Sequence, residues 1–266
     1  MSTVRPGTLR QVTPTAAVLL APNPGPMTLE GTNSWVLGAP GEARCVVVDP
    51  GPLHEGHLAG LAAAGQVAVV LLTHGHADHS AGAARLAELT GAPVRALDPA
   101  HRLGDEGLDE GDVVAAAGVE VRVLATPGHT ADSLSLVLGD AVLTGDTVLG
   151  RGTTVVAHPD GVLGDYLRSL ERLRELGDRM VLPGHGPELP AAGEAAERYL
   201  VHRRERLAQV EAAVAAGATT PRAVVEVVYA DVDRALWPAA ELSVRAQLAH
   251  LARLGVQRAD PGVRGA

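Results

Sequence analysis

The chain of 266 residues contains no lysine and no phenylalanine, and only 2% of its residues are aromatic. Its core must therefore be built from valine, leucine and alanine. Every one of the 22 basic residues is arginine, a bias typical of a GC-rich genome, so we expect a bacterial source. Cys45 is the only cysteine and has no disulfide partner within the chain. It lies in an apolar run at residues 45–48 and is expected to pack as a small hydrophobe.

The sequence also lacks a long apolar run. No stretch is long enough to cross a bilayer, and residues 16–21 are too short for the core of a signal peptide. We therefore expect a cytoplasmic protein with no membrane partner. The net charge of −9 argues against nonspecific nucleic-acid binding by the whole surface. Residues 1–200 hold 13 arginines against 24 acidic residues, whereas residues 201–266 hold 9 against 7. This weakly basic tail is either a solvated helix surface or a contact for nucleic acid.

The segment THGHADH at residues 73–79 concentrates potential metal ligands. Imidazole nitrogens and carboxylate oxygens are ligands that zinc accepts. In an extended segment His74 and His76 point the same way, because side chains repeat every two residues. Asp78 and His79 follow a turn and can face a second ion. One strand end can therefore serve two metals.

Three more candidate ligands follow apolar, strand-like runs. His129 lies in PGHT at residues 127–130, Asp146 in TGDT at 144–147, and His185 in PGHG at 183–186. Each run ends in a glycine-containing turn that presents one ligand. An α/β scaffold builds a site in this way, on loops that follow several strands and meet at one edge of the rigid sheets. A loop that is rich in histidine by chance would not have these matching partners downstream.

In order and spacing, these motifs resemble the metallo-β-lactamase superfamily over residues 14–190, including an early strand that ends at Asp49. The resemblance implies an α/β fold, an αββα sandwich of two mixed sheets with helices outside. It implies that His74, His76 and His129 hold one metal, that Asp78, His79 and His185 hold a second, and that Asp146 bridges them. Two zinc ions per chain are expected, although such ligands also accept manganese or iron. A metal-bridging hydroxide would attack the substrate, with Asp78 orienting it. Asp49 would accept a hydrogen bond from a ligand histidine or a backbone group, or cap a turn.

Two segments are more specific. LEGTNSW at residues 29–35 and GDTVLGRGTT at 145–154 resemble the β-lactamase-like protein 2 family, which includes single-strand-selective endoribonucleases and fungal thioesterases. The implied reaction is hydrolysis of an ester-like bond, in single-stranded RNA or in a small-molecule ester or thioester. Alternatives are a glyoxalase II-like thioester or lactone hydrolase and, remotely, a non-catalytic binding protein, which the intact ligand set disfavours. Residues 150–154 must lie near the metals, as donors to an anionic substrate group or as a purely structural loop.

Apolar periodicity and turn residues predict helices over 54–66, 79–90 (with Ser80 as its cap) and 163–176, and strands over 93–97, 119–124, 134–138 and 141–143. Beyond Pro190 we predict helices over 192–216, 221–229 and 238–254, the second capped by Thr220. Gly255 is expected to stop the last helix and Val256 to begin a short strand. This order indicates a winged-helix-like domain at residues 201–266 after a hydrolase domain at 1–200.

The last predicted helix carries Leu242, Leu248, Leu251 and Leu254 on one stripe, so we expect the tail to pack beside the cleft. A nucleic-acid contact is the alternative. The remaining histidines are expected to face solvent or to pack, namely His54, His57, His101, His202 and His250, with His158 less certain because it follows the loop at 150–154.

Overall fold

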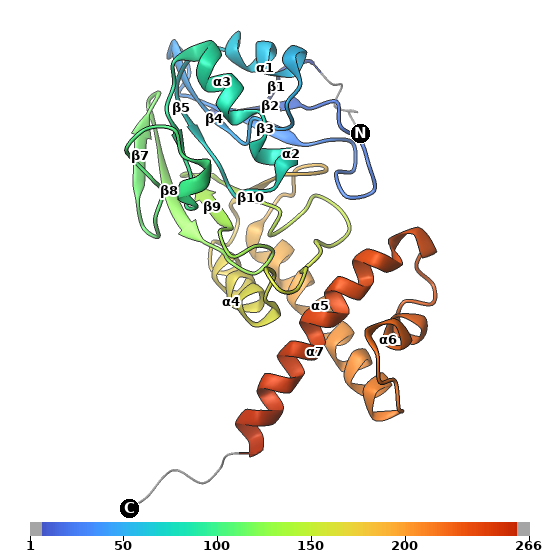
Figure 1. Ribbon diagram of the computed structural model, residues 1–266. Helices are drawn as coiled ribbons and strands as arrows, with labels where there is room; N and C mark the ends of the chain where they lie inside the picture. Colours follow the sequence, from blue (N-terminus) through green and yellow to red (C-terminus); the bar gives the residue numbers. More distant parts are fainter. Residues whose placement is uncertain (1–6, 260–266) are drawn as a thin grey trace, which may run out of the picture.

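Two mixed β-sheets lie face to face and enclose the main apolar layer of the protein (Figure 1). The computed structural model describes residues 7–259. The first sheet runs in the order β1 (Arg10–Thr13), β2 (Ala16–Leu20), β3 (Asn33–Leu37), β4 (Arg44–Val48), β5 (Gln66–Leu71) and β6 (Val94–Arg95). The second runs β11 (Met180–Pro183), β10 (Ala141–Gly145), β9 (Leu134–Val137), β8 (Val119–Ala125) and β7 (Val113–Ala116). The pairs β4–β5, β5–β6 and β10–β11 are parallel, and the other pairs are antiparallel.

The side-chain pattern explains where each strand lies. In β8 the buried Val119, Val121 and Val123 alternate with exposed Glu120 and Arg122, so one face meets the core and the other meets solvent. By contrast, β2 and β3 are buried along their whole length, which fits strands inside a sheet that is covered on both faces. The amphipathic pattern of β8 thus fixes which face of the second sheet is inside.

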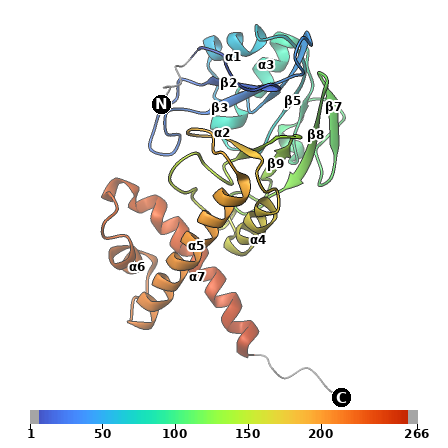
Figure 2. The ribbon, with the colours of Figure 1, turned by 180° about the vertical axis from the view of Figure 1, so that it is seen from behind.

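Helices cover the outer faces of both sheets, which completes the expected αββα sandwich (Figures 1 and 2). Helices α1 (Glu55–Ala62) and α3 (Ala83–Thr90) pack on the first sheet through Leu58, Leu61 and Leu86. Helix α4 (Leu163–Arg174) and the first half of α5 (Ala192–Ala215) cover the second sheet. Between α1 and α3 lies the short α2 (Ala77–Ser80), which carries part of the histidine motif.

The C-terminal helices form a second, smaller core. The outer half of α5 packs with α6 (Pro221–Val228) and α7 (Trp237–Ala259) around a separate apolar cluster, and these parts project beyond the sandwich in both views (Figures 1 and 2). Ala246 of α7 joins the cluster beneath α4, so the tail also packs against the sandwich as expected. The domain boundary predicted at residue 200 falls within α5 and stays a prediction. Within residues 7–259, no helix combines the length and apolar character that a membrane span requires.

Several local predictions were wrong. Ser80 does not cap a helix: it lies in α2, and its hydroxyl donates to the Gly75 carbonyl. The predicted helix at 79–90 is interrupted at Gly82, whose backbone lies so close to Leu58 that a Cβ atom would be 2.7 Å from its side chain. Gly255 does not stop α7, which continues to Ala259, so no strand begins at Val256. The predicted leucine stripe of α7 is only partly buried: Leu248 and Leu251 pack against the C-terminal cluster as expected, whereas Leu242 is 40% exposed. The buried positions of α7 include Ala240, Ser243, Val244 and Gln247. Thr220 does cap α6, as predicted, by accepting from the Ala223 amide.

Candidate metal centre

The expected ligand residues meet at one rim of the sandwich, on turns that follow four strands. His74 follows β5, His129 follows β8, Asp146 follows β10 and His185 follows β11. The structure brings the seven residues into three groups in which one ligand atom of each residue lies within 4.8 Å of the others. The groups are His74, His76 and His129; His74, His79 and Asp146; and Asp78, His79 and His185.

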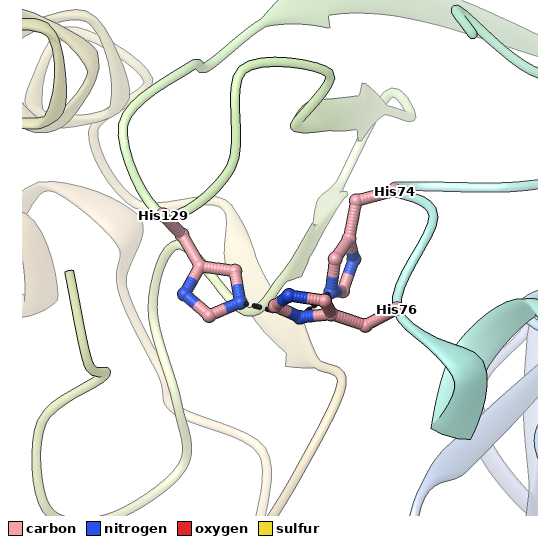
Figure 3. Close-up of side chains that lie close together, drawn as sticks. All are labelled: His74, His76 and His129. Atoms are coloured by element: carbon pink, nitrogen blue, oxygen red, sulfur yellow. Dashed lines mark hydrogen bonds between the residues drawn. The ribbon is translucent and has the colours of Figure 1, made fainter. Parts of the chain in front are cut away.

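In the first group, three imidazole rings turn their nitrogens toward one another (Figure 3). His76 Nδ1 lies 3.1 Å from His74 Nε2 and 3.1 Å from His129 Nε2. The ring planes of His76 and His129 are nearly perpendicular, at 84°. The nitrogens therefore converge on one small region instead of stacking.

Neighbouring groups fix the protonation pattern of these rings. The Nδ1 of His129 donates to the Val155 carbonyl at 2.7 Å. The hydroxyl of Thr73 donates to Asp49 at 2.6 Å, so its oxygen accepts from His74 Nδ1 at 3.1 Å. Because Nδ1 carries the proton in both rings, Nε2 of His74 and of His129 presents a lone pair to the centre.

The group of Asp78, His79 and His185, called here the second metal group, repeats this arrangement. His79 Nδ1 donates to Asp49 Oδ2 at 2.9 Å, and His185 Nδ1 donates to the Gly31 carbonyl at 3.1 Å. The two Nε2 atoms then face each other at 3.2 Å. Asp78 Oδ2 lies 3.1 Å from His185 Nε2 and 3.6 Å from His79 Nε2. The prediction that Asp49 accepts from a ligand-type histidine is confirmed, and Asp49 also accepts from the Thr73 amide at 2.8 Å.

Asp146 lies between the two groups. One of its oxygens is 3.4 Å from His79 Nε2, and the other is 3.5 Å from His185 Nε2 and 3.8 Å from His129 Nε2. Its Oδ1 is buried with no hydrogen-bond partner among the described residues. Lone pairs that converge at about 3 Å repel one another unless a cation lies among them. The donor set and the orphaned oxygen therefore fit divalent metal ions.

The electrostatics favour positive charge at His79 and an ionised carboxylate at Asp146, whereas they disfavour positive charge at His74. Burial alone would lower the pKa of His79, but Asp146 and Asp49 outweigh it and raise that pKa well above its usual value. Burial would raise the pKa of Asp146, yet His79 and His185 hold it well below the ordinary range. Burial lowers the pKa of His74 well below normal. Protons and metal ions thus compete for the same lone pairs.

The segment at residues 29–35 positions the turn that carries His185. Asn33 donates from its side chain to the carbonyls of Pro183 and Gly186, at 3.0 and 2.8 Å. The indole of Trp35 donates to the Pro183 carbonyl at 3.1 Å. Gly184 is required in this turn, because a Cβ atom there would lie 2.6 Å from Asp146 Oδ1. The turn therefore holds His185 close beside the shared aspartate.

A cleft of about 350 Å³ opens from the metal centre toward the C-terminal helices. His129 and Asp146 line its inner end, the loop at 149–155 lines one wall, and side chains of α5, α7 and residues 229–236 line the other. The expectation that the loop at 150–154 lies near the metal centre is confirmed, because the Thr154 hydroxyl lies 3.1 Å from His129 Nδ1.

Sequence reasoning missed several residues of this region. His101 and Asp132 lie against Gly75, where an added Cβ would be 2.5 Å from the His101 ring, so this glycine permits their approach. His202 and Arg203 line the cleft although they lie in a charged helical run that resembles an ordinary solvated surface. His57 takes the packing role that was one of its two expected roles: it is buried, with its Nε2 2.8 Å from the Ser34 hydroxyl. No local sequence signal marks these contacts, because each joins residues distant in the chain.

Comparison with known families agrees with the geometry. The profile of the metallo-beta-lactamase superfamily matches residues 27–185, and that of the beta-lactamase associated winged helix domain matches residues 220–261. The chain therefore belongs to the metallo-beta-lactamase superfamily, a group of generally hydrolytic metalloenzymes, and carries a C-terminal winged-helix domain.

Curated relatives confirm the more specific resemblance. The chain is similar to the beta-lactamase-like protein 2 homolog of Caenorhabditis elegans, with 34% identity over 71% of this chain and 67% of the relative. It is also 34% identical to an atrochrysone carboxyl ACP thioesterase of Aspergillus fumigatus, over 75% of this chain and 64% of that protein. These relatives come from an animal and a fungus, so the bacterial source stays a prediction, as does the cytoplasmic location.

Solved structures share the fold. A beta-lactamase domain protein from Burkholderia ambifaria superimposes with a TM-score of 0.81 at 23% identity, covering 96% of this chain and 90% of that one. TTHA1623, solved in a di-iron-bound form, superimposes with a TM-score of 0.53 at 29% identity, covering 65% of this chain and 94% of that one.

Proposed function

We propose that this protein is a dinuclear metal-dependent hydrolase that cleaves a thioester. The observation that carries the proposal is a double set of converging histidine lone pairs around one shared carboxylate, at the inner end of a largely apolar cleft. His74, His76 and His129 would hold one ion, Asp78, His79 and His185 the other, and Asp146 both. When bound, such ions lower the pKa of a water and polarise the oxygen of the electrophile.

The chain's own residues have separate tasks. Val155, Asp49 and Gly31 orient the ligand histidines through their Nδ1 protons. The side chain of Asp78 is 30% exposed, whereas those of His79 and His185 are fully buried. Burial would raise the pKa of Asp78, but the adjacent imidazoles of His185 and His79 keep it lowered. Asp78 is thus ionised and can accept a proton from an attacking water at the rim.

The choice of thioester over phosphodiester rests on the cleft. Met27, Leu29, Leu149, Val232 and Leu236 give it an apolar wall that suits an acyl chain. The similarity to a fungal thioesterase supports the same choice. Cleavage of single-stranded RNA is the second candidate, favoured by the arginines in the same cleft. A lactone hydrolase would use the same centre.

A substrate panel tests the proposal. The metal-loaded protein is assayed on four substrates: hexanoyl-N-acetylcysteamine, a lactone of hydroxyhexanoic acid, a single-stranded RNA oligomer and a generic phosphodiester. We expect the thioester to be cleaved with the highest kcat/KM and the activity to be lost in Asp146→Asn. Asp140→Asn, which changes an exposed carboxylate outside the site, is the matched control. Faster cleavage of RNA, or no difference between the two variants, would overturn the assignment.

The metal is proposed to be zinc, because imidazole and carboxylate ligands suit it. Iron remains the competing identity, since TTHA1623 was solved in a di-iron-bound form. Elemental analysis of protein purified without chelator distinguishes the two metals.

A further inference from the structure

The charges that line the cleft differ in sign from the protein as a whole. The chain has a net charge of −9, yet the only acidic side chain among the residues that line the cleft is Asp146 of the metal centre. Three arginines line the same cleft, Arg151, Arg203 and Arg206. Concentrating cations in a cleft of an acidic protein attracts an anionic ligand to that place.

Arg151 is already neutralised, because it forms an ion pair with Glu30 at the mouth of the cleft. Arg203 is different. It is only 4% exposed, its Nη2 donates to the Thr154 carbonyl, and its guanidinium lies 5.1 Å from the centre of the Tyr166 ring. Among residues 7–259 it has no carboxylate within 4.0 Å, and its Nε is buried without a partner. A buried cation with no counter-charge is costly, so its position calls for an anion.

Arg206 lies one helical turn further along α5 and faces the same cleft. Its guanidinium lies 4.4 Å from the centre of the Tyr229 ring and donates to the Val228 carbonyl. No carboxylate of the described chain lies within ion-pair distance of it either. These contacts fix the orientation of the Arg206 guanidinium but do not neutralise its charge.

We propose that Arg203 and Arg206 form an anion-binding subsite, which selects thioesters that carry a carboxylate or phosphate beyond an apolar chain. The inference rests on the proposed thioesterase function and adds a substrate class to it. The scissile carbonyl would lie at the inner end, beside His129 and Asp146. The apolar linker would lie along Leu149 and Leu236, and the anion at the guanidiniums. Planar guanidiniums suit both anions, since each accepts paired hydrogen bonds from them.

The test compares three thioesters of one chain length. Hexanoyl-N-acetylcysteamine carries no anion, adipoyl-N-acetylcysteamine carries a carboxylate on the acyl side, and hexanoyl-coenzyme A carries phosphates on the leaving group. We expect wild-type protein to prefer an anionic thioester through a lower KM. Arg206→Met should reduce that preference by about tenfold or more, the loss expected for one charge-assisted hydrogen bond. Arg206→Lys should restore part of it. Which of the two anionic substrates is affected identifies the side on which the anion lies.

Arg204→Met is the matched control. Arg204 lies on the same helix, is exposed, and forms a long ion pair with Glu171, at 3.8 Å. We expect its preference to equal that of the wild type. Arg203→Lys serves as a second variant that keeps the buried charge and shortens its reach. An unchanged preference in Arg206→Met, or an equal loss in Arg204→Met, would overturn the subsite.

A binding measurement separates this proposal from the thioesterase assignment. Calorimetric titration with adipamic acid, which has a carboxylate at one end and an amide at the other, requires no hydrolysis. Binding that weakens about tenfold in Arg206→Met, but not in Arg204→Met, supports the subsite even if no thioester is cleaved. Equal binding of adipamic acid by both variants refutes the anion-binding subsite. An effect of Arg206→Met that is seen only with a single-stranded RNA oligomer also refutes it.

Discussion

Replacing Asp49 by asparagine should weaken the second metal group while leaving the first largely intact. Asp49 accepts three hydrogen bonds, from the Thr73 amide at 2.8 Å, the Thr73 hydroxyl at 2.6 Å and His79 Nδ1 at 2.9 Å. An asparagine amide can keep the oxygen that faces the Thr73 amide. Its NH₂ group would then face two donors, the Thr73 hydroxyl and His79 Nδ1. The imidazole would have to rotate or move its proton to Nε2, which removes one lone pair from the metal centre.

The magnitude follows from the strength of that bond. A hydrogen bond to a charged acceptor contributes about 1.5–3 kcal/mol. A loss of this size corresponds to an affinity for one ion that is about 10–100-fold lower. The same range is found when the hydrogen-bond partner of a metal-ligating histidine is removed. The Thr73 hydroxyl also positions His74, so a smaller effect on the first group is expected.

The assay is metal affinity by competition with a chromophoric chelator, together with elemental analysis after dialysis. Asp49→Asn should lose its second ion at chelator concentrations that leave the first bound. Asp146→Asn should lose both, because its carboxylate lies between the two groups. Asp140→Asn should behave as the wild type. The reasoning is refuted if Asp49→Asn binds both ions as tightly as the wild type, or loses both as readily as Asp146→Asn.

Three further predictions concern the metal count, the tail and pH. Elemental analysis of gently purified protein should give close to two metal ions per chain; a consistent value of zero, with no gain on adding zinc, would contradict the dinuclear centre. Deleting residues 220–266 uncovers Val210 and Ala213 of α5, so the Tm should fall and substrate preference should change while the metal ligands stay in place. Unchanged Tm and substrate range would show an independent tail. Burial is the larger cause, and the nearby His54 the smaller cause, that together lower the pKa of His57 to about 4. Neutral His57 therefore contributes stability above about pH 6.5 that is lost toward pH 4, by up to about 3 kcal/mol. His57→Gln should flatten this dependence in denaturant unfolding, and an identical slope would contradict the assignment.

The clustering of the candidate ligands could be predicted from the sequence because these residues belong to local patterns. Each ligand follows a strand-like apolar run, so its position depends on one strand end and one turn. Asp49 was predictable for the same reason, since it directly follows β4, and β4 lies beside β5, which leads into Thr73 and His74. The helix boundaries were less certain. Gly82 separates α2 from α3: its amide donates to the Gly51 carbonyl at 2.9 Å and Leu58 of α1 packs against it. No residue between 79 and 90 reveals these contacts.

The cleft could not be predicted in the same way, because its outer wall belongs to helices brought there by tertiary packing. In sequence, residues 202–206 form a run of charged and polar side chains that favours a solvated helix face. In the structure Arg203 points inward and donates to the Thr154 carbonyl, in the backbone segment that also contacts His129. The long helix therefore links the two parts of the chain physically. The backbone that Arg203 contacts at Thr154 also accepts, at Val155, the Nδ1 proton of the candidate ligand His129, and Arg203 and Arg206 present uncompensated positive charge to the cleft. A substitution at Arg203 should consequently affect both metal binding and substrate preference, whereas one at Arg206 should affect preference alone.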